Sequence, residues 1–90
     1  MNTSDIQSLR GPILVLGAGG FVGSNLFLAL SKERSDVYAL VHHHTAWRLQ
    51  GAQMDRIIQA DLTSSSSVEH LIESVQPQTI FDCIAYGWIQ

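Results

Sequence analysis

The chain has 90 residues, of which 46% are hydrophobic, and this is enough for one small folded domain. A formal net charge of -3 and the lack of a basic run exclude an electrostatic footprint for nucleic acid. No apolar stretch reaches the roughly 18 residues of a membrane span, and residues 1–10 lack the apolar centre of a signal peptide. Because Cys83 has no second cysteine to pair with, we expect a protein of the reducing cytoplasm. From the charge and the lack of an apolar span, we expect neither nucleic-acid nor membrane partners.

Residues 1–10 are polar and are expected to fray, and Gly11-Pro12 separates them from the first strand. That strand is the apolar run Ile13 to Leu16, whose length and branching are typical of a strand buried on both faces. It runs directly into a turn rich in glycine and then into a helix, which together form the first half of a βαβ unit.

The glycines of this turn predict a phosphate-binding site. Gly17 lets the chain reverse tightly, and Gly23 lets the helix lie close to the strand. Gly19 and Gly20 let backbone N–H groups approach a ligand, and the positive end of the helix dipole then favours a phosphate or diphosphate. A turn that only needs a positive φ would use one or two glycines, so this alternative explains the pattern less well.

The glycine spacing satisfies one of two fingerprints. G-x-G-x-x-G fails because its third glycine would fall at Val22, whereas G-x-x-G-x-x-G is satisfied. The run GAGGFVG resembles the cofactor loop of the extended short-chain dehydrogenase/reductase family, the NAD-dependent epimerases, dehydratases and reductases that often act on nucleotide sugars. The resemblance implies that one group of residues holds the dinucleotide diphosphate: Gly17, Gly19, Gly20, Phe21, Val22 and Gly23.

Helices and strands alternate through the rest of the chain. The first helix should end within residues 31–36, and the second strand is Val37 to Val41. The third strand is expected over residues 56–60, and a capping box of Ser66 and Glu69 should start the next helix. Gln76-Pro77 should end that helix before a fourth strand over residues 79–85. The expected buried stripes are Phe21, Val22, Leu26, Phe27 and Leu30 in the first helix, and Val68, Leu71, Ile72 and Val75 in the second.

This alternation predicts an α/β fold, a Rossmann-like parallel sheet of about four strands in the order 3-2-1-4 with helices on both faces. A ligand crevice is expected between the first and fourth strands, at their carboxyl ends. The apolar fourth strand would leave an open sheet edge. We therefore expect residues 1–90 to be the amino-terminal NAD(P)-binding domain of a longer protein, and the alternative is a homodimer paired along that edge.

The end of the second strand is expected to select the cofactor. An acidic side chain at this point binds the ribose 2′-OH of NAD, but this chain has His42 and no Asp or Glu there. Since His42, His43 and Arg48 would suit a 2′-phosphate, we expect NADP in preference to NAD. The adjacent histidines also suggest zinc, yet neighbouring residues point to alternate sides and no further ligand is close in sequence, so no metal site is expected.

Three further positions gain a role only through the resemblance. It implies that Asp61 faces the adenine amino group, that Leu62 lines the adenine pocket, and that Ala85 lies beside the ribose and nicotinamide. On physical grounds alone, Asp61 after a strand is as often a loop or cap residue. Cys83 has no neighbouring base and is expected to pack in the fourth strand, not to react.

The resemblance implies a nucleotide-sugar epimerase, dehydratase or reductase that transfers hydride at the nicotinamide. Family members carry a Tyr-x-x-x-Lys pair, which neither Tyr38 nor Tyr86 forms here. No catalytic residue is therefore assigned, and this chain alone is not expected to catalyse a reaction. The alternative is a non-catalytic regulatory module that senses NADP(H). An S-adenosylmethionine-binding domain is a third option, but it usually needs an acidic residue where His42 stands.

Overall fold

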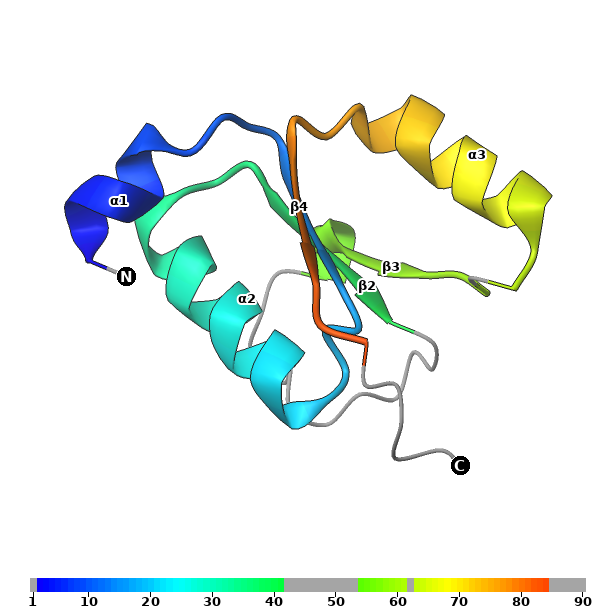
Figure 1. Cartoon of the computed structure of the whole chain (residues 1–90), viewed down its shortest axis with the longest axis horizontal. Coiled ribbons are helices and arrows are strands. Elements are labelled where there is room, and N and C mark those ends of the chain that lie inside the picture. The colour runs from blue at the N-terminus through cyan, green and yellow to red at the C-terminus, as the bar shows by residue number, and fades with distance from the viewer. Residues whose placement is uncertain (1, 42–53, 62, 85–90) are drawn as a thin grey trace.

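A parallel sheet forms the centre of the structure, a computed structural model that describes residues 2–41, 54–61 and 63–84. The strands are β1 (Ile13–Leu16), β2 (Val37–Val41), β3 (Ile57–Gln59) and β4 (Thr79–Asp82). The helices are α1 (Thr3–Ser8), α2 (Phe21–Glu33) and α3 (Ser65–Val75), with a short 3-10 helix, η2 (Met54–Arg56), before β3. The order β3-β2-β1-β4, with every pair parallel, confirms the predicted Rossmann-like topology. Figure 1 shows α1 and α2 on one side of the sheet and α3 on the other.

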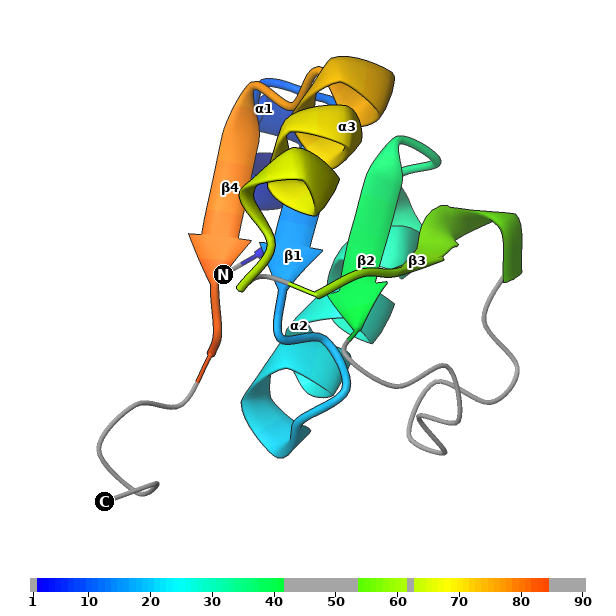
Figure 2. The ribbon, with the colours of Figure 1, turned by 90° about the vertical axis from the view of Figure 1, so that its right-hand side faces the viewer.

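The two faces of the sheet bury different side chains, because successive residues of a strand point to opposite faces. Ile13 and Val15 of β1 share a buried cluster with Phe27 and Leu30 of α2. Leu14 points to the other face, where α3 packs, and Figure 2 shows both helices against the sheet. Each fully buried side chain of this size stabilises the fold by about 1.5–3 kcal/mol. The cluster under α3 consists of Leu14, Leu40, Leu71 and Val75.

The face that α2 buries differs from the predicted one. Phe21 and Val22 are 70% and 65% exposed, so the prediction that they join the core is wrong. Phe27 and Leu30 are buried as predicted. The reason lies in Gly23, which faces the backbone of the glycine turn with no room for a side chain. This contact fixes the rotation of the helix about its axis and turns the preceding two side chains to solvent.

The start of α3 also differs from the prediction. The N-cap is Ser64, whose hydroxyl accepts a hydrogen bond from the backbone N–H of Ser67 at 3.4 Å. The capping box of Ser66 and Glu69 is therefore wrong. In a run of consecutive serines each residue has the chemistry of a cap, and the turn after β3 selects among them. The backbone N–H of Ser64 donates to the carbonyl of Asp61 at 3.1 Å and so sets where the helix begins.

The strands β3 and β4 are shorter than predicted. Arg56 lies in η2, with its guanidinium 5.3 Å from the centroid of the Tyr38 ring, a cation–π distance. At the other strand, the Asp82 carboxylate accepts a hydrogen bond from the backbone N–H of Ile84 at 3.1 Å. Through this local bond the N–H of Ile84 has a partner other than a neighbouring strand, and β4 ends at Asp82.

Two large apolar side chains, one in β4 and one in α3, are exposed. Ile80 of β4 is 48% exposed, and Ile72 of α3 is 40% exposed, so the prediction that Ile72 belongs to the buried stripe is wrong. Leu71 and Val75 are buried as predicted. Among the strands that the structure describes, none pairs with the outer edge of β4.

An N-terminal helix occupies the segment that was expected to fray. Asn2 caps α1, because its side chain accepts a hydrogen bond from the Asp5 backbone N–H at 2.9 Å and the Asp5 carboxylate accepts one from the Asn2 N–H. Ile6 is buried in the cluster under α2. The prediction of fraying is therefore wrong, because one buried side chain and a capping box together order a short polar segment.

A change at Gln76 tests the end of α3. Gln76 follows the helix with φ 49° and ψ 55°, a left-handed conformation that costs most L residues about 1–2 kcal/mol. We predict that Gln76→Gly raises the free energy of unfolding by about 0.5–1 kcal/mol in urea denaturation. Gln78→Gly is the control. Gln78 has no positive φ, so this substitution should lower the free energy of unfolding. Equal losses at both positions would contradict the left-handed conformation.

The ion pair at the α2–β2 connection predicts a pH dependence of stability. Hydrogen bonds from Arg34 to both carboxylate oxygens, at 2.8 and 2.7 Å, lower the pKa of Asp36, although burial acts in the opposite direction. A carboxylate with a lowered folded-state pKa stabilises the fold above its unfolded pKa of about 3.9 and loses that effect as the pH falls through the folded value. The stability of Asp36→Asn should therefore fall less steeply than that of the wild type from about pH 5 to pH 2.

Denaturant unfolding at a series of pH values measures this slope. Glu73→Gln is the control, because it removes an equal charge from the exposed side of α3. If Asp36→Asn and the wild type had the same slope, the ion pair would make no contribution to folding.

Candidate functional site

The glycine turn lies at the carboxyl end of β1 and leads directly into α2. Gly17 has a φ of 73°, which L side chains rarely adopt. A Cβ at this position would also lie 3.0 Å from the carbonyl carbon and oxygen of Cys83 and from the backbone nitrogen of Ile84. Both the backbone conformation and the segment after β4 therefore require glycine at position 17, and the predicted tight reversal is present.

Gly23 is required by the contact between α2 and the turn. A Cβ there would lie 2.8 Å from the carbonyl carbon of Gly17 and 2.9 Å from the Cα of Ala18, and it would overlap the Gly17 carbonyl oxygen. These are backbone atoms, which cannot move aside as the end of a side chain can. The first turn of the helix thus lies directly against the end of β1.

Gly20 differs from the other two because none of the residues that the structure describes fills the space next to it. Among these residues, a Cβ at Gly20 would have the Gly17 carbonyl oxygen nearby, at 3.7 Å, which is an ordinary van der Waals distance. Gly20 is the N-cap of α2, and no side chain caps the helix. The first N–H groups of a helix have no partners within it, so this end of α2 presents donors next to open space.

Backbone hydrogen bonds hold the turn in this shape. The N–H of Ala18 donates to the carbonyl of Leu40 in β2 at 3.0 Å, and the N–H of Gly20 donates to the carbonyl of Gly17 at 3.2 Å. Ala18 is fully buried, and sequence reasoning did not assign it a role. At this position the sequence shows only a small residue between glycines. The hydrogen bond to β2 could not be predicted from it, because that bond depends on the order of the strands in the sheet. Gly19 completes the turn and is half-buried.

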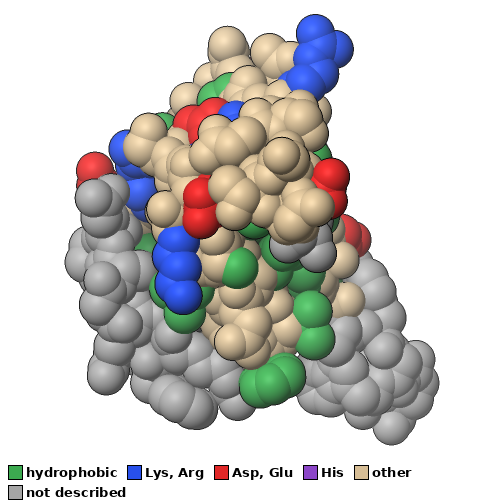
Figure 3. Space-filling view, turned by 90° about the vertical axis from the view of Figure 1, so that its left-hand side faces the viewer, with side chains coloured by type: hydrophobic (Ala, Val, Ile, Leu, Met, Phe, Trp, Pro, Cys, Tyr) green, Lys and Arg blue, Asp and Glu red, His purple; other side chains and the backbone are tan. Residues whose placement is uncertain are grey.

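The two residues that follow the glycine turn, Phe21 and Val22, are apolar and exposed. Phe21 and Val22 begin α2 with their side chains in solvent, so packing in the core does not explain them. Figure 3 views the molecule from the side of α1 and α2 and shows charged side chains of both signs scattered over it, with hydrophobic side chains towards its lower end.

Asp61 follows β3 in a turn that it helps to form. Its Oδ1 accepts hydrogen bonds from the backbone N–H of Thr63 at 2.9 Å and from the Thr63 hydroxyl at 2.7 Å. This is the loop role that the residue type alone predicts. The structure does not test the adenine contact that the resemblance implies. Four other expected site residues, His42, Arg48, Leu62 and Ala85, lie outside the described residues.

Cys83 packs as predicted. It is half-buried against the cluster under α2, and burial, followed by the charge of Asp82, raises the pKa of its thiol. A raised pKa lowers the thiolate fraction and with it the reactivity. Its functional contribution is instead its backbone, which lies against Gly17 and forms one wall of the turn. Sequence reasoning did not predict that contact.

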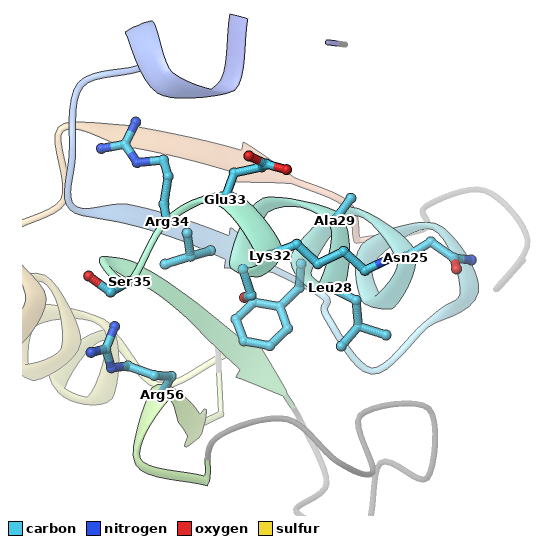
Figure 4. Close-up of a pocket in the computed structure, with 11 residues that line it drawn as sticks. Asn25, Leu28, Ala29, Lys32, Glu33, Arg34, Ser35 and Arg56 are labelled. Carbon is cyan, nitrogen blue, oxygen red and sulfur yellow. The ribbon is translucent and has the colours of Figure 1, made fainter. Parts of the chain in front are cut away.

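A groove on the described surface lies elsewhere. It measures about 980 Å³ and runs along α2 to the N-terminal ends of β2 and β3. Figure 4 shows Lys32 and Arg34 on its α2 side and Arg56 across from them. Of the expected cofactor residues that the structure describes, none lines this groove, because parallel strands direct their N-terminal ends away from the ligand crevice.

Residues 2–41, 54–61 and 63–84 contain no group of three or more potential metal ligands. Within the same residues, no helix has the length and apolar character needed to cross a membrane.

The contrast between the glycines predicts that substitution at Gly23 destabilises the fold, whereas substitution at Gly20 has little effect on stability. Gly23→Ala should lower the free energy of unfolding by about 1–3 kcal/mol, since the methyl group has no space. Gly20→Ser should stay within a few tenths of a kcal/mol of the wild type, because serine fits the open space and is a good N-cap. Urea denaturation of the two variants side by side measures the difference. A loss at Gly20 equal to that at Gly23 would contradict the open space at Gly20.

Comparison with known proteins agrees with this geometry. A family model described as the NAD dependent epimerase/dehydratase family matches residues 13–90, which include the glycine turn and all four strands of the sheet. Searches of curated proteins and of solved structures gave no match. The match covers most of the chain and begins at the first residue of β1. The chain belongs to the NAD dependent epimerase/dehydratase family.

Proposed function

We propose that the glycine turn binds the diphosphate of NADP(H) and that this chain is the cofactor-binding part of an oxidoreductase. The observation that carries the proposal is the difference between the glycines. Gly17 and Gly23 are required by the packing of the chain itself, whereas residues 2–41, 54–61 and 63–84 leave the space next to Gly20 open. That space adjoins the uncapped N-terminus of α2, where N–H donors and the helix dipole favour an anion.

The residues present fit a dinucleotide at this edge of the sheet. The turn residues Gly19, Gly20, Phe21 and Val22 would hold the diphosphate through their backbone, because their side chains are absent or point to solvent. Asp61 and Leu62 would contact the adenine, and Ala85 would lie beside the ribose and nicotinamide. When bound, NADP(H) supplies hydride transfer at C4 of the nicotinamide.

The preference for NADP rests on charge at the end of β2. This strand ends at Val41, and the sequence has no Asp or Glu from there until Asp55. A 2′-phosphate would therefore meet no carboxylate in this segment, and His42 and Arg48 would offer it positive charge. An acidic residue at this point would have favoured the 2′-OH of NAD.

A nucleotide sugar is the proposed substrate of the complete protein, which would carry its catalytic residues outside this sequence. No strand within the described residues pairs with the outer edge of β4, and this supports a longer sheet, because an apolar parallel strand is normally covered. The alternative is a regulatory module that senses NADP(H) without catalysis and pairs along the same edge. A longer reading frame with Tyr-x-x-x-Lys would favour the enzyme, and a dimer of the 90-residue chain in light scattering would favour the module.

Calorimetric titration of the chain with NADPH, NADH and S-adenosylmethionine tests the proposal. NADPH should bind most tightly, and Gly20→Asp should weaken its binding at least about tenfold, since a carboxylate would occupy the space of the diphosphate. Aspartate is a good N-cap, so this variant should remain folded.

Gly20→Asn is the matched control, because it has the same size without the charge. The difference in affinity between the two variants measures the electrostatic part of the effect, and the difference between Gly20→Asn and the wild type measures the steric part. Unchanged NADPH affinity in folded Gly20→Asp, or no binding of any nucleotide by the folded wild type, would contradict the proposal.

A further inference from the structure

The N-terminal helix α1 precedes the residues that match the family, yet it is part of the folded core. Ile6 is 6% exposed and belongs to the same buried cluster as Phe27 and Leu30 of α2. Gln7 donates a hydrogen bond from Nε2 to the backbone carbonyl of Glu33, the last residue of α2, at 2.7 Å. The end of α1 and the end of α2 are therefore joined by both apolar and polar contacts.

Arg34 makes the strongest of these contacts. Its Nη1 donates hydrogen bonds to the carbonyl oxygen of Ile6, at 2.9 Å, and to that of Leu9, the C-cap of α1. The guanidinium gives the Leu9 carbonyl a hydrogen-bond donor and gives a second donor to the Ile6 carbonyl, which also accepts from the Leu9 N–H at 3.3 Å. Asp36 holds the guanidinium from the other side through two hydrogen bonds. Figure 4 shows the Arg34 side chain extending from the end of α2 towards α1.

The helix α2 connects this contact to the glycine turn. At its N-terminal end, Gly23 lies against the backbone of Gly17 and Ala18 without space for a methyl group. At its C-terminal end, the polar contacts with α1 come from Glu33 and Arg34. Because the interior between them is close-packed, a displacement of one end of the helix moves the other.

We infer that α1 is a latch that holds α2 on the sheet and thereby fixes the glycine turn at the opposite end of the helix. Arg34 is a positioning residue in this arrangement, since it acts through α2. When α1 detaches, the cluster around Phe27 loses Ile6, and Arg34 loses two acceptors. The effect on cofactor affinity rests on the proposed function, whereas the latch itself does not.

Amide hydrogen exchange without ligand tests the latch. In Arg34→Gln, the amides of Ile6 in α1 and of Ser24 at the glycine turn should exchange about tenfold to a hundredfold faster, as expected when charge-assisted hydrogen bonds are lost. The amides of Ala60 and Cys83, which bond to β2 and β1, should change much less. Lys32→Gln is the matched control, because it removes an exposed cation from the same helix.

The pattern across the amides decides between a latch and general destabilisation. Equal acceleration at all four amides would mean that Arg34 only stabilises the whole fold, and acceleration at Ile6 without Ser24 would mean that α1 opens alone. Either result would overturn the latch. Ile6→Ala provides a second variant that leaves Arg34 in place and should give the same pattern if Arg34→Gln does not fold.

NADPH titration of the same variants then separates the latch from the proposed function. If the glycine turn binds the cofactor, the apparent dissociation constant should rise as the reciprocal of the fraction of chains in which α2 stays on the sheet, so that a threefold loss of affinity corresponds to about two thirds of the chains displaced. If the wild type binds no cofactor, the proposed function fails, but the exchange pattern still supports or overturns the latch. Unchanged affinity in a variant whose Ser24 amide exchanges faster would mean that the latch does not position the turn.

Discussion

The close approach of α2 to the end of β1 is the constraint on which the rest of the structure depends. It requires Gly23, since a side chain there would overlap the backbone of Gly17. The contact fixes the rotation of α2, which buries Phe27 and Leu30 and turns Phe21 outward. It also brings the uncapped N-terminus of the helix to the carboxyl end of the sheet, next to the space left open at Gly20. A single steric requirement thus determines both the core under α2 and the position of the candidate phosphate site.

Much of the fold could be predicted from the sequence, because β1 and β2 are apolar runs bounded by glycine and by charge, and alternation with helices limits the topology. The predictions that failed depend on tertiary contacts. Apolar periodicity gives the width of a helical stripe, but the rotation of α2 was set by a glycine contact. Among consecutive serines, the turn after β3 selected Ser64 as the cap. The helix α1 has one buried apolar side chain, Ile6, and its polar partner Arg34 is far away in sequence.

The location of the candidate site and the separate roles of Gly17 and Gly23 could be predicted from the sequence, but the atoms that surround each glycine could not. Four glycines after a strand indicated the turn, and the family resemblance is confirmed. The fingerprint assigned Gly17 to the tight reversal and Gly23 to the contact between helix and strand, and the backbone atoms around both positions agree with these roles. The structure separates two glycines that serve the fold from one whose space is open. The wall that Cys83 forms against Gly17 depends on the pairing of β1 with β4, which joins residues far apart in the chain.

The most direct test of the central claim is an amide NMR titration of the 90-residue chain with pyrophosphate and then with NADPH. The claim is that the N-terminus of α2 holds a diphosphate. It predicts that pyrophosphate shifts the amide resonances of Gly19 to Val22 first and that NADPH shifts the same resonances at lower concentration, because it adds contacts through its adenosine and nicotinamide parts. Shifts confined to other residues, such as the basic side of the groove along α2, would contradict it.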